Sequence, residues 1–124
     1  MYKLAVKKDF IAQHFLVGGD WGSENQKHSH HYRIEIQIEA MALDQHGFLV
    51  DIVEVKEHLE KLVAYYRDRT LNELAEFKDL NPSIENLANI SYRALYPFFH
   101  KIGVEGFTVE IWEDDIAWVS YQEE

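Results

Sequence analysis

The chain has 124 residues, 47% of them hydrophobic, with 22 Asp and Glu against 12 Lys and Arg and no cysteine. This length and composition predict a single domain over residues 1–124 with a real core. The net charge of −10 argues against nucleic acid or anionic lipid as a partner, and the absence of cysteine excludes disulfides, thiolate metal ligands and a cysteine nucleophile.

The N-terminal segment gives no sign of a membrane or secretory signal. No stretch approaches the ~20 apolar residues that cross a membrane. Residues 1–8 alternate between apolar and polar side chains instead of forming an unbroken apolar block. We therefore expect a cytoplasmic protein with no membrane partner.

The first half of the chain alternates like paired strands. Tyr2 to about Leu16 begins with alternating apolar and polar residues, which predicts a strand, and the glycine-rich residues 18–23 predict a loop. Residues 32–39 alternate most regularly, with an apolar side chain at every even position. That pattern predicts a strand of an antiparallel sheet with one buried face and one wet face.

The hydrophobic period then changes to that of a helix. Apolar residues from Ile52 to Tyr66 recur at steps of three and four, which predicts an amphipathic helix. After the polar, irregular segment 67–80, a second helix is expected to start at residues 81–83 and to present an apolar face as far as Phe98. Either Asn81 or Ser83 can be its N-cap.

Two further strands complete the expected fold. Residues 107–112 alternate, residues 116–121 form another short strand, and residues 113–115 form a tight turn between them. The order ββααββ predicts an α+β fold, with two helices on one face of a four-stranded antiparallel sheet. Because such a sheet has two open edges, we expect subunits to pair edge to edge and close a barrel by oligomerisation.

His28 and His30 carry the strongest chemical signal. Alternate residues of a strand point the same way, about 7 Å apart along the backbone, so the two rings can converge on one ion. His14 lies near the end of the first predicted strand, where an antiparallel neighbour brings it to the same place. Three imidazoles with one open position are typical of catalytic zinc. Strand histidines without a metal can show this spacing too, and His31 is either a surface residue or a group behind the ligands.

An ordered set of motifs spans residues 10 to 113. The set consists of Phe10-x-Ala12-x-His14, His28-x-His30-x-Tyr32, Leu43-Asp44-x-x-Gly47-x-x-x-Asp51, Leu71-Asn72, Asn81-Pro82-Ser83-x-Glu85-Asn86-Leu87-Ala88 and Glu113. Together they resemble the 6-pyruvoyltetrahydropterin synthase family and the related bacterial 6-carboxytetrahydropterin synthases. The resemblance implies the tunnelling fold, in which barrel-forming trimers stack into a hexamer with active sites at subunit interfaces.

The same resemblance implies roles for individual residues. Zinc would be the cofactor and His14, His28 and His30 its ligands. Glu113 sits where the family places the glutamate that anchors the pterin ring; a carboxylate can accept two hydrogen bonds from a pterin edge.

Two positions depart from the family pattern. The family's catalytic cysteine lies four residues before the first histidine of His-x-His, and here that position is Glu24. The family's Asp-His pair is replaced by Arg67 and Asp68. Some relatives with glutamate at the cysteine position are associated with cleavage of the side chain to 6-hydroxymethyl-dihydropterin. Glu24 resembles that variant and can be a general base, with Asp68 as a second catalytic candidate.

Three functions remain open at this point. The first is a zinc-dependent lyase acting on 7,8-dihydroneopterin triphosphate, which either cleaves the side chain or eliminates triphosphate. The second is the 6-carboxytetrahydropterin reaction of queuosine biosynthesis, against which the absent cysteine counts. The third is an inactive member that still binds metal and pterin.

Overall fold

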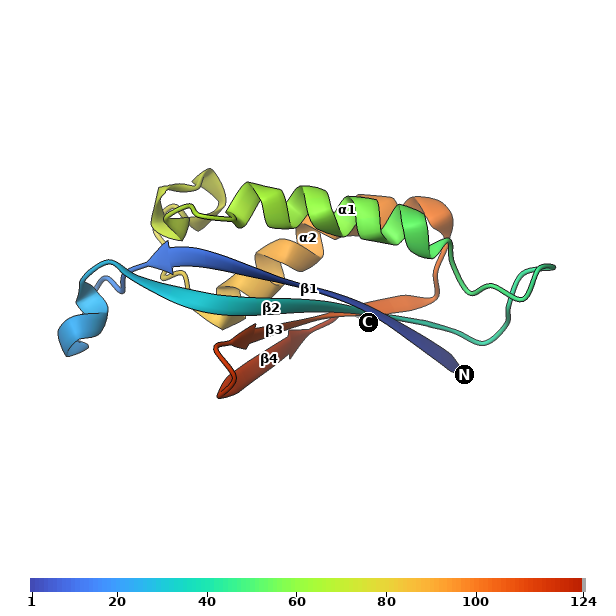
Figure 1. The fold of residues 1–124 in the computed structure, drawn as a ribbon, viewed down its shortest axis with the longest axis horizontal. Coiled ribbons are helices and arrows are strands. Elements are labelled where there is room, and N and C mark those ends of the chain that lie inside the picture. The colour runs from blue at the N-terminus through green and yellow to red at the C-terminus, as the bar shows by residue number, and fades with distance from the viewer. Residues whose placement is uncertain (124) are drawn as a thin grey trace.

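The computed structural model describes residues 1–123, which form a four-stranded antiparallel sheet with two helices on one face (Figure 1). The sheet order β1-β2-β3-β4 follows the chain, and the predicted ββααββ arrangement is confirmed. The strands are β1 (Tyr2–His14), β2 (His28–Ala40), β3 (Gly106–Glu113) and β4 (Ala117–Tyr121), and the helices are α1 (Ile52–Tyr66) and α2 (Ile84–Ile102). Within residues 1–123 no helix combines the length and apolar character that a membrane crossing needs.

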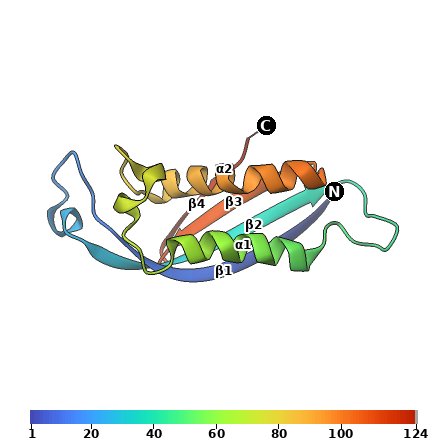
Figure 2. The ribbon, with the colours of Figure 1, turned by 90° about the horizontal axis from the view of Figure 1, so that it is seen from above.

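The core lies between the sheet and the helices, which run side by side above it (Figure 2). Helix α1 packs on β1, and α2 packs on β3 and β4. The even-numbered apolar residues of β2, from Tyr32 to Ile38, are fully buried under them. Burying an aliphatic side chain of this size contributes about 1.5–3 kcal/mol. This burial fixes which face of each strand turns towards the helices.

Side-chain caps define where both helices begin. The Asp51 carboxylate accepts a hydrogen bond from the main-chain amide of Val53 at the start of α1. Ser83, and not Asn81, is the N-cap of α2, because its hydroxyl accepts from the main-chain amide of Asn86 at 3.1 Å. Pro82 therefore precedes the helix, which leaves its carbonyl group available to the neighbouring strands.

The segment after α1 covers one end of the free edge of β1. The main-chain amide of Asp68 donates to the carbonyl of Ile11 at 2.7 Å, and the amide of Gln13 donates to the carbonyl of Arg69 at 2.9 Å. Among residues 1–123, the rest of the β1 edge and the outer edge of β4 have no strand partner. Both edges are open to pairing with another copy of the chain.

Candidate metal centre

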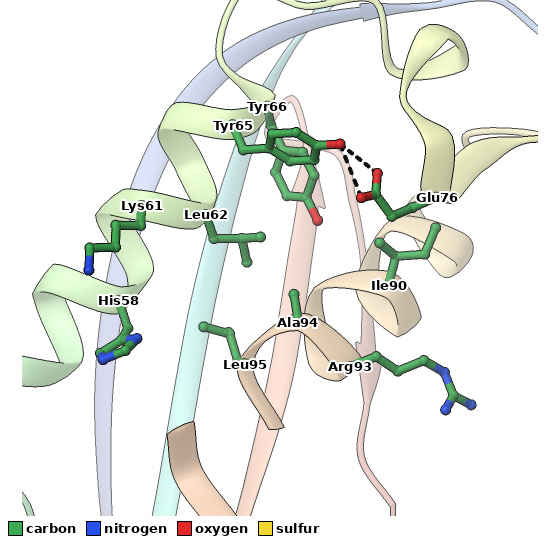
Figure 3. Close-up of a pocket in the computed structure, with 10 residues that line it drawn as sticks. All are labelled: His58, Lys61, Leu62, Tyr65, Tyr66, Glu76, Ile90, Arg93, Ala94 and Leu95. Atoms are coloured by element: carbon green, nitrogen blue, oxygen red, sulfur yellow. Dashed lines mark hydrogen bonds between the residues drawn. The ribbon is translucent and has the colours of Figure 1, made fainter. Parts of the chain in front are cut away.

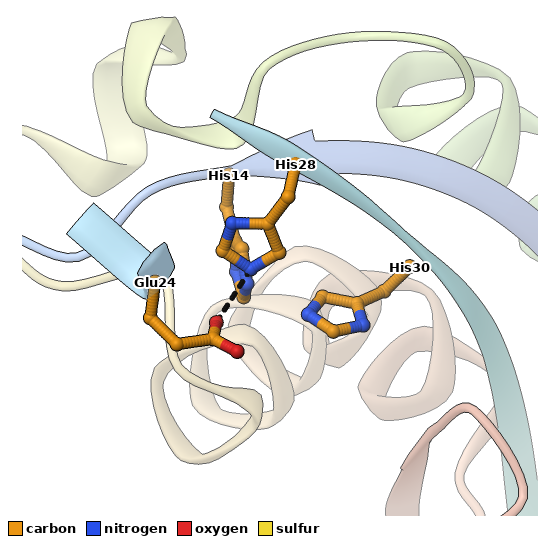
Figure 4. Close-up of side chains that lie close together, drawn as sticks. All are labelled: His14, Glu24, His28 and His30. Atoms are coloured by element: carbon orange, nitrogen blue, oxygen red, sulfur yellow. Dashed lines mark ion pairs between the residues drawn. The ribbon is translucent and has the colours of Figure 1, made fainter. Parts of the chain in front are cut away.

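Three histidine rings meet where β1 ends and β2 begins (Figure 4). The antiparallel register places His14 directly opposite His28, and His30 follows two residues later on the same face. The centroids of the rings lie 4.6 to 4.8 Å from one another. The fold thus brings together the three side chains that the sequence predicts as metal ligands.

Hydrogen bonds to Nδ1 fix the orientation of these rings. Nδ1 of His14 lies 2.9 Å from the carbonyl oxygen of Pro82, and Nδ1 of His28 lies 2.7 Å from that of Gln26. A carbonyl oxygen only accepts, so Nδ1 donates and the neutral ring keeps its lone pair at Nε2. Among the described residues, Nε2 of His30 is buried without a hydrogen-bond partner, and Nε2 of His28 has only the Glu24 carboxylate beside it, 2.7 Å away. A buried ring nitrogen without a partner is rare, and a metal ion would satisfy it.

His14 is the most enclosed of the three rings, with 3% of its surface exposed. Burial lowers the pKa of His14, and the nearby His30 and His28 lower it further, against the opposing effect of the hydrogen bond to Pro82. The buried hydroxyl of Tyr32 lies 3.2 Å from Nδ1 of the same ring. These surroundings favour the neutral form of His14, which is the form that binds a metal.

Glu24 is the fourth member of the cluster. Its Oε2 lies 2.7 Å from Nε2 of His28, and it belongs with the three histidines to a group whose potential ligand atoms all lie within 4.8 Å of one another. The residue sits on a short 3-10 turn, η1 (Gly22–Asn25). The Glu24 carbonyl accepts from the amide of Leu16 at 2.9 Å, and the Asn25 side chain donates to the carbonyl of Leu16 at 3.0 Å. Glu24 therefore faces the rings without any movement of the loop.

This set of donors suits zinc. Imidazole nitrogen and carboxylate oxygen are both ordinary zinc ligands, and three protein ligands with one open position make a catalytic site. If the three imidazoles bind the ion, Glu24 is left beside the open position. A carboxylate placed there can take a proton from a bound hydroxyl or water.

Glu113 borders the same cluster from β3. It pairs in register with Tyr32, and its Oε1 lies 3.6 Å from Nε2 of His30. Burial is the main cause that raises the pKa of the Glu113 carboxyl group, and the charge of a protonated His30 would oppose it. The predicted pterin anchor is therefore half-buried at the edge of the metal site.

Asp68 lies outside this cluster. It follows α1 in a left-handed conformation with φ of 61°. It borders a surface depression together with Ile11 and His31, whose side chains point away from the helix-covered face because strand residues alternate. His31 is exposed there, with Nε2 3.4 Å from the carboxylate of Asp9, so it is a surface residue. Within one chain, Asp68 and Glu24 do not meet.

A separate cavity of about 740 Å³ lies between α1 and α2 (Figure 3). Apolar side chains of both helices form its floor. Of its polar groups, the Tyr65 hydroxyl is bonded to Glu76 at 2.8 and 3.0 Å, and Lys61 and Arg93 extend in opposite directions. No set of reactive groups converges in this cavity among the described residues, so we place the chemistry at the histidine cluster.

Three groups that orient the rings are absent from the sequence-based set. Two are the main-chain carbonyls of Pro82 and Gln26, which have no side-chain signature. The third is Asp114, whose Oδ2 lies 2.9 Å from Nδ1 of His30. In the sequence Asp114 is one of three consecutive acidic residues in the predicted turn, between Glu113 and Asp115. Its position next to the predicted pterin anchor is the only sequence feature that could have indicated a role at the site.

Comparison with known proteins agrees with this fold. The family model of 6-pyruvoyl tetrahydropterin synthase matches residues 3–124. The Caenorhabditis elegans 6-pyruvoyl tetrahydropterin synthase superposes with a TM-score of 0.86 at 19% identity, covering 99% of this chain and 96% of that one. A Plasmodium vivax 6-pyruvoyltetrahydropterin synthase, in which a catalytic glutamate is replaced by alanine, gives 0.80 at 14% identity, covering 99% and 98%.

The Plasmodium falciparum enzyme of the same name gives a TM-score of 0.79 at 11% identity, covering 98% of this chain and 97% of that one. No curated protein matches the chain. At these identities the solved structures establish the fold, and the family model, which spans almost the whole chain, establishes the family. The chain belongs to the 6-pyruvoyl tetrahydropterin synthase family of pterin-processing lyases.

Proposed function

We propose that the chain is a zinc-dependent lyase that acts on 7,8-dihydroneopterin triphosphate, with Glu24 as its general base. The observation that carries this proposal is the Glu24 carboxylate, 2.7 Å from His28, beside three imidazoles that have their Nδ1 atoms engaged elsewhere. The catalytic glutamate of the Plasmodium vivax enzyme supports it, because a glutamate serves as a catalytic residue in that relative.

His14, His28 and His30 would hold the zinc ion. Zinc bound there would polarise a substrate hydroxyl and lower its pKa. The chain itself contributes orientation, because the three rings come from two paired strands and need no rearrangement to present Nε2.

Glu24 would then remove the proton from the hydroxyl on the second carbon of the substrate side chain. The electrons of that O–H bond form an aldehyde C=O, and the bond between the first and second side-chain carbons breaks. Its electron pair moves into the dihydropterin ring system, and a proton returns to the first carbon. The products are 6-hydroxymethyl-dihydropterin and a two-carbon aldehyde that keeps the triphosphate. Elimination of triphosphate, as in a pyruvoyl-type synthase, is the alternative outcome at the same site.

Glu113 would hold the pterin ring. Its carboxylate is 30% exposed and borders His30, so it can accept two hydrogen bonds from a pterin edge while the side chain of the substrate reaches the histidines. Such a charged fork is stronger than neutral hydrogen bonds and sets the orientation of the ring.

Asp68 would act across a subunit boundary. Asp68 lies at the β1 edge of the sheet, whereas Glu113 and the turn after it lie near β4, which forms the opposite edge. Pairing of β1 with β4 of a neighbouring copy closes a barrel and carries Asp68 towards the neighbour's site. We therefore propose a homo-oligomer, a trimer or a hexamer, as the active form.

The zinc assignment predicts that removing two rings removes the metal. Elemental analysis should find one zinc ion per chain in the wild type, and His28→Ala/His30→Ala should lose it, because a single imidazole does not hold the ion. His31→Ala, which removes an exposed ring of the next residue, should keep it. Equal zinc content in the double variant and the wild type would contradict the assignment.

The base assignment predicts a loss of rate alone. Glu24→Gln should lower turnover of 7,8-dihydroneopterin triphosphate by about 10²–10⁴-fold, the usual contribution of a general base, with zinc content and pterin affinity unchanged. Glu57→Gln, on the exposed face of α1, is the matched control and should be fully active.

Product analysis sharpens the same test. Glu24→Cys restores the thiol that the family pattern carries at this position and should shift the products from the hydroxymethyl to the pyruvoyl type. Full activity of Glu24→Gln would refute the base assignment. If neither the wild type nor any variant forms a product, the chain is a metal- and pterin-binding member without turnover. A 6-carboxytetrahydropterin product would instead indicate the queuosine reaction.

The anchor assignment predicts a loss of affinity. Glu113→Gln keeps the shape but replaces one acceptor oxygen with a donor, so pterin binding should weaken by about 1.5–3 kcal/mol, roughly 10- to 150-fold. Calorimetric titration with a dihydropterin measures this. Asp115→Asn makes the same change of charge two residues away, on a side chain that is 87% exposed, and should bind normally. Wild-type affinity in Glu113→Gln would leave Glu113 as a turn residue.

The trans role of Asp68 predicts complementation. Asp68→Asn should lose about 10²-fold or more of turnover, whereas Asp79→Asn, at another exposed left-handed aspartate, should not. Mixed oligomers of Asp68→Asn and Glu24→Gln chains should recover activity, because some sites then combine an intact Glu24 with an intact Asp68. A stable monomer in light scattering, or mixtures as inactive as their parents, would contradict this arrangement.

A further inference from the structure

Asp114 ties the turn between β3 and β4 to His30. Its Oδ2 lies 2.9 Å from Nδ1 of His30, and its Oδ1 accepts a hydrogen bond from the main-chain amide of His31 at 3.1 Å. The main-chain amide of Asp114 donates to the carbonyl of His31 at 2.7 Å. Two contacts of the carboxylate and one of the main chain, all with two consecutive residues of β2, hold Asp114 in one place.

The backbone of the turn is what points the carboxylate at the ring. The ladder between β2 and β3 ends with the pair Tyr32 and Glu113, so Asp114 stands one position beyond it, opposite His31. Asp114 has a φ of 54°, in the left-handed region that aspartate tolerates better than most residues. A strand conformation continued through Asp114 would not return its side chain to β2 in this way.

His30 differs from the other two histidines in the group that holds its Nδ1. His14 and His28 donate to neutral main-chain carbonyls of Pro82 and Gln26. His30 donates to a carboxylate. A hydrogen bond to an ionised acceptor is stronger, and it makes the imidazole a more basic metal ligand.

We infer that Asp114 is a positioning residue of the metal centre, which holds His30 with Nε2 towards the metal and strengthens that ring as a ligand. The inference rests on the proposed function, because it requires zinc at His14, His28 and His30. It assigns to Asp114 a role separate from that of Glu113, although the two are neighbours.

The distance argues against Asp114 as a metal ligand itself. His30, Glu113 and Asp114 also form a group of potential ligands. An ion shared by Nδ1 of His30 and the carboxylate would hold the two atoms about 3.3 Å apart, given zinc bonds of about 2.0–2.1 Å in a tetrahedral site. The observed 2.9 Å is the length of a charged hydrogen bond instead.

A competition titration with a chromogenic zinc chelator tests the inference. Asp114→Gly removes the carboxylate and suits the positive φ of the turn, and Asp114→Asn keeps an acceptor oxygen without the charge. Zinc affinity should fall about 10- to 100-fold in Asp114→Gly and less in Asp114→Asn. Asp115→Asn should match the wild type. The melting temperature of the metal-free variants separates a folding defect from a change at the site.

A second readout does not involve the metal. In the metal-free protein at a pH where the rings are neutral, ¹⁵N NMR should show His30 with its proton on Nδ1. In Asp114→Gly the ring should become a mixture of the two tautomers, and in Asp114→Asn, which has one acceptor oxygen for two donors, the Nδ1–H form should be less populated than in the wild type. A wild-type His30 with its proton on Nε2 would overturn the inference.

The remaining outcomes separate this inference from the function on which it rests. Wild-type zinc affinity in Asp114→Gly, with zinc still lost in His28→Ala/His30→Ala, overturns the role of Asp114 alone. Two zinc ions per wild-type chain and one in Asp114→Gly would make Asp114 a ligand and also overturn it. Zinc retained in the double histidine variant overturns both proposals together.

Discussion

The register between β1 and β2 is the constraint on which the site depends. It places His14 opposite His28 and turns both, with His30, towards the face that the helices cover. Because side chains alternate along a strand, a slip of one residue would carry all the rings of a strand to the other face. The same slip would expel Tyr32, Ile34 and Ile36 from the core. Hydrophobic burial along the length of β2 therefore holds the three histidines in register, although none of them is itself apolar.

Three different parts of the chain then orient the three rings. The loop after β1 supplies the Gln26 carbonyl, the segment before α2 supplies the Pro82 carbonyl, and the β3–β4 turn supplies Asp114. The cap at Ser83 leaves Pro82 outside the helix, so its carbonyl can reach His14. Each ring is thus oriented by a different segment, so the geometry of the site depends on all three segments being in place. Partial unfolding of any one should loosen one ligand before it breaks the sheet.

The sequence predicts most of this molecule because its signals are local. Alternation identifies the strands, the step of three and four identifies α1, and the spacing of His28 and His30 identifies a shared face. What it leaves undecided depends on contacts between distant elements. The choice between Asn81 and Ser83 as the cap follows from packing, and the exposure of His31 follows from which face the helices cover. The sequence does not show that Asp68 lies at the β1 edge or that Asp114 contacts His30. Both contacts arise only when residues far apart in the chain meet.

Position 24 is attached to its loop by main-chain groups alone. The Glu24 carbonyl accepts from Leu16 and its amide donates to the carbonyl of Trp21, while the side chain touches only His28 among the polar contacts of the described residues. Exchange of that side chain therefore leaves the hydrogen bonds of η1 intact. A change of the codon for residue 24 can then place another reactive group beside the same three imidazoles without a change in the loop backbone. The chemistry at position 24 can therefore change while the fold and the three histidines stay the same.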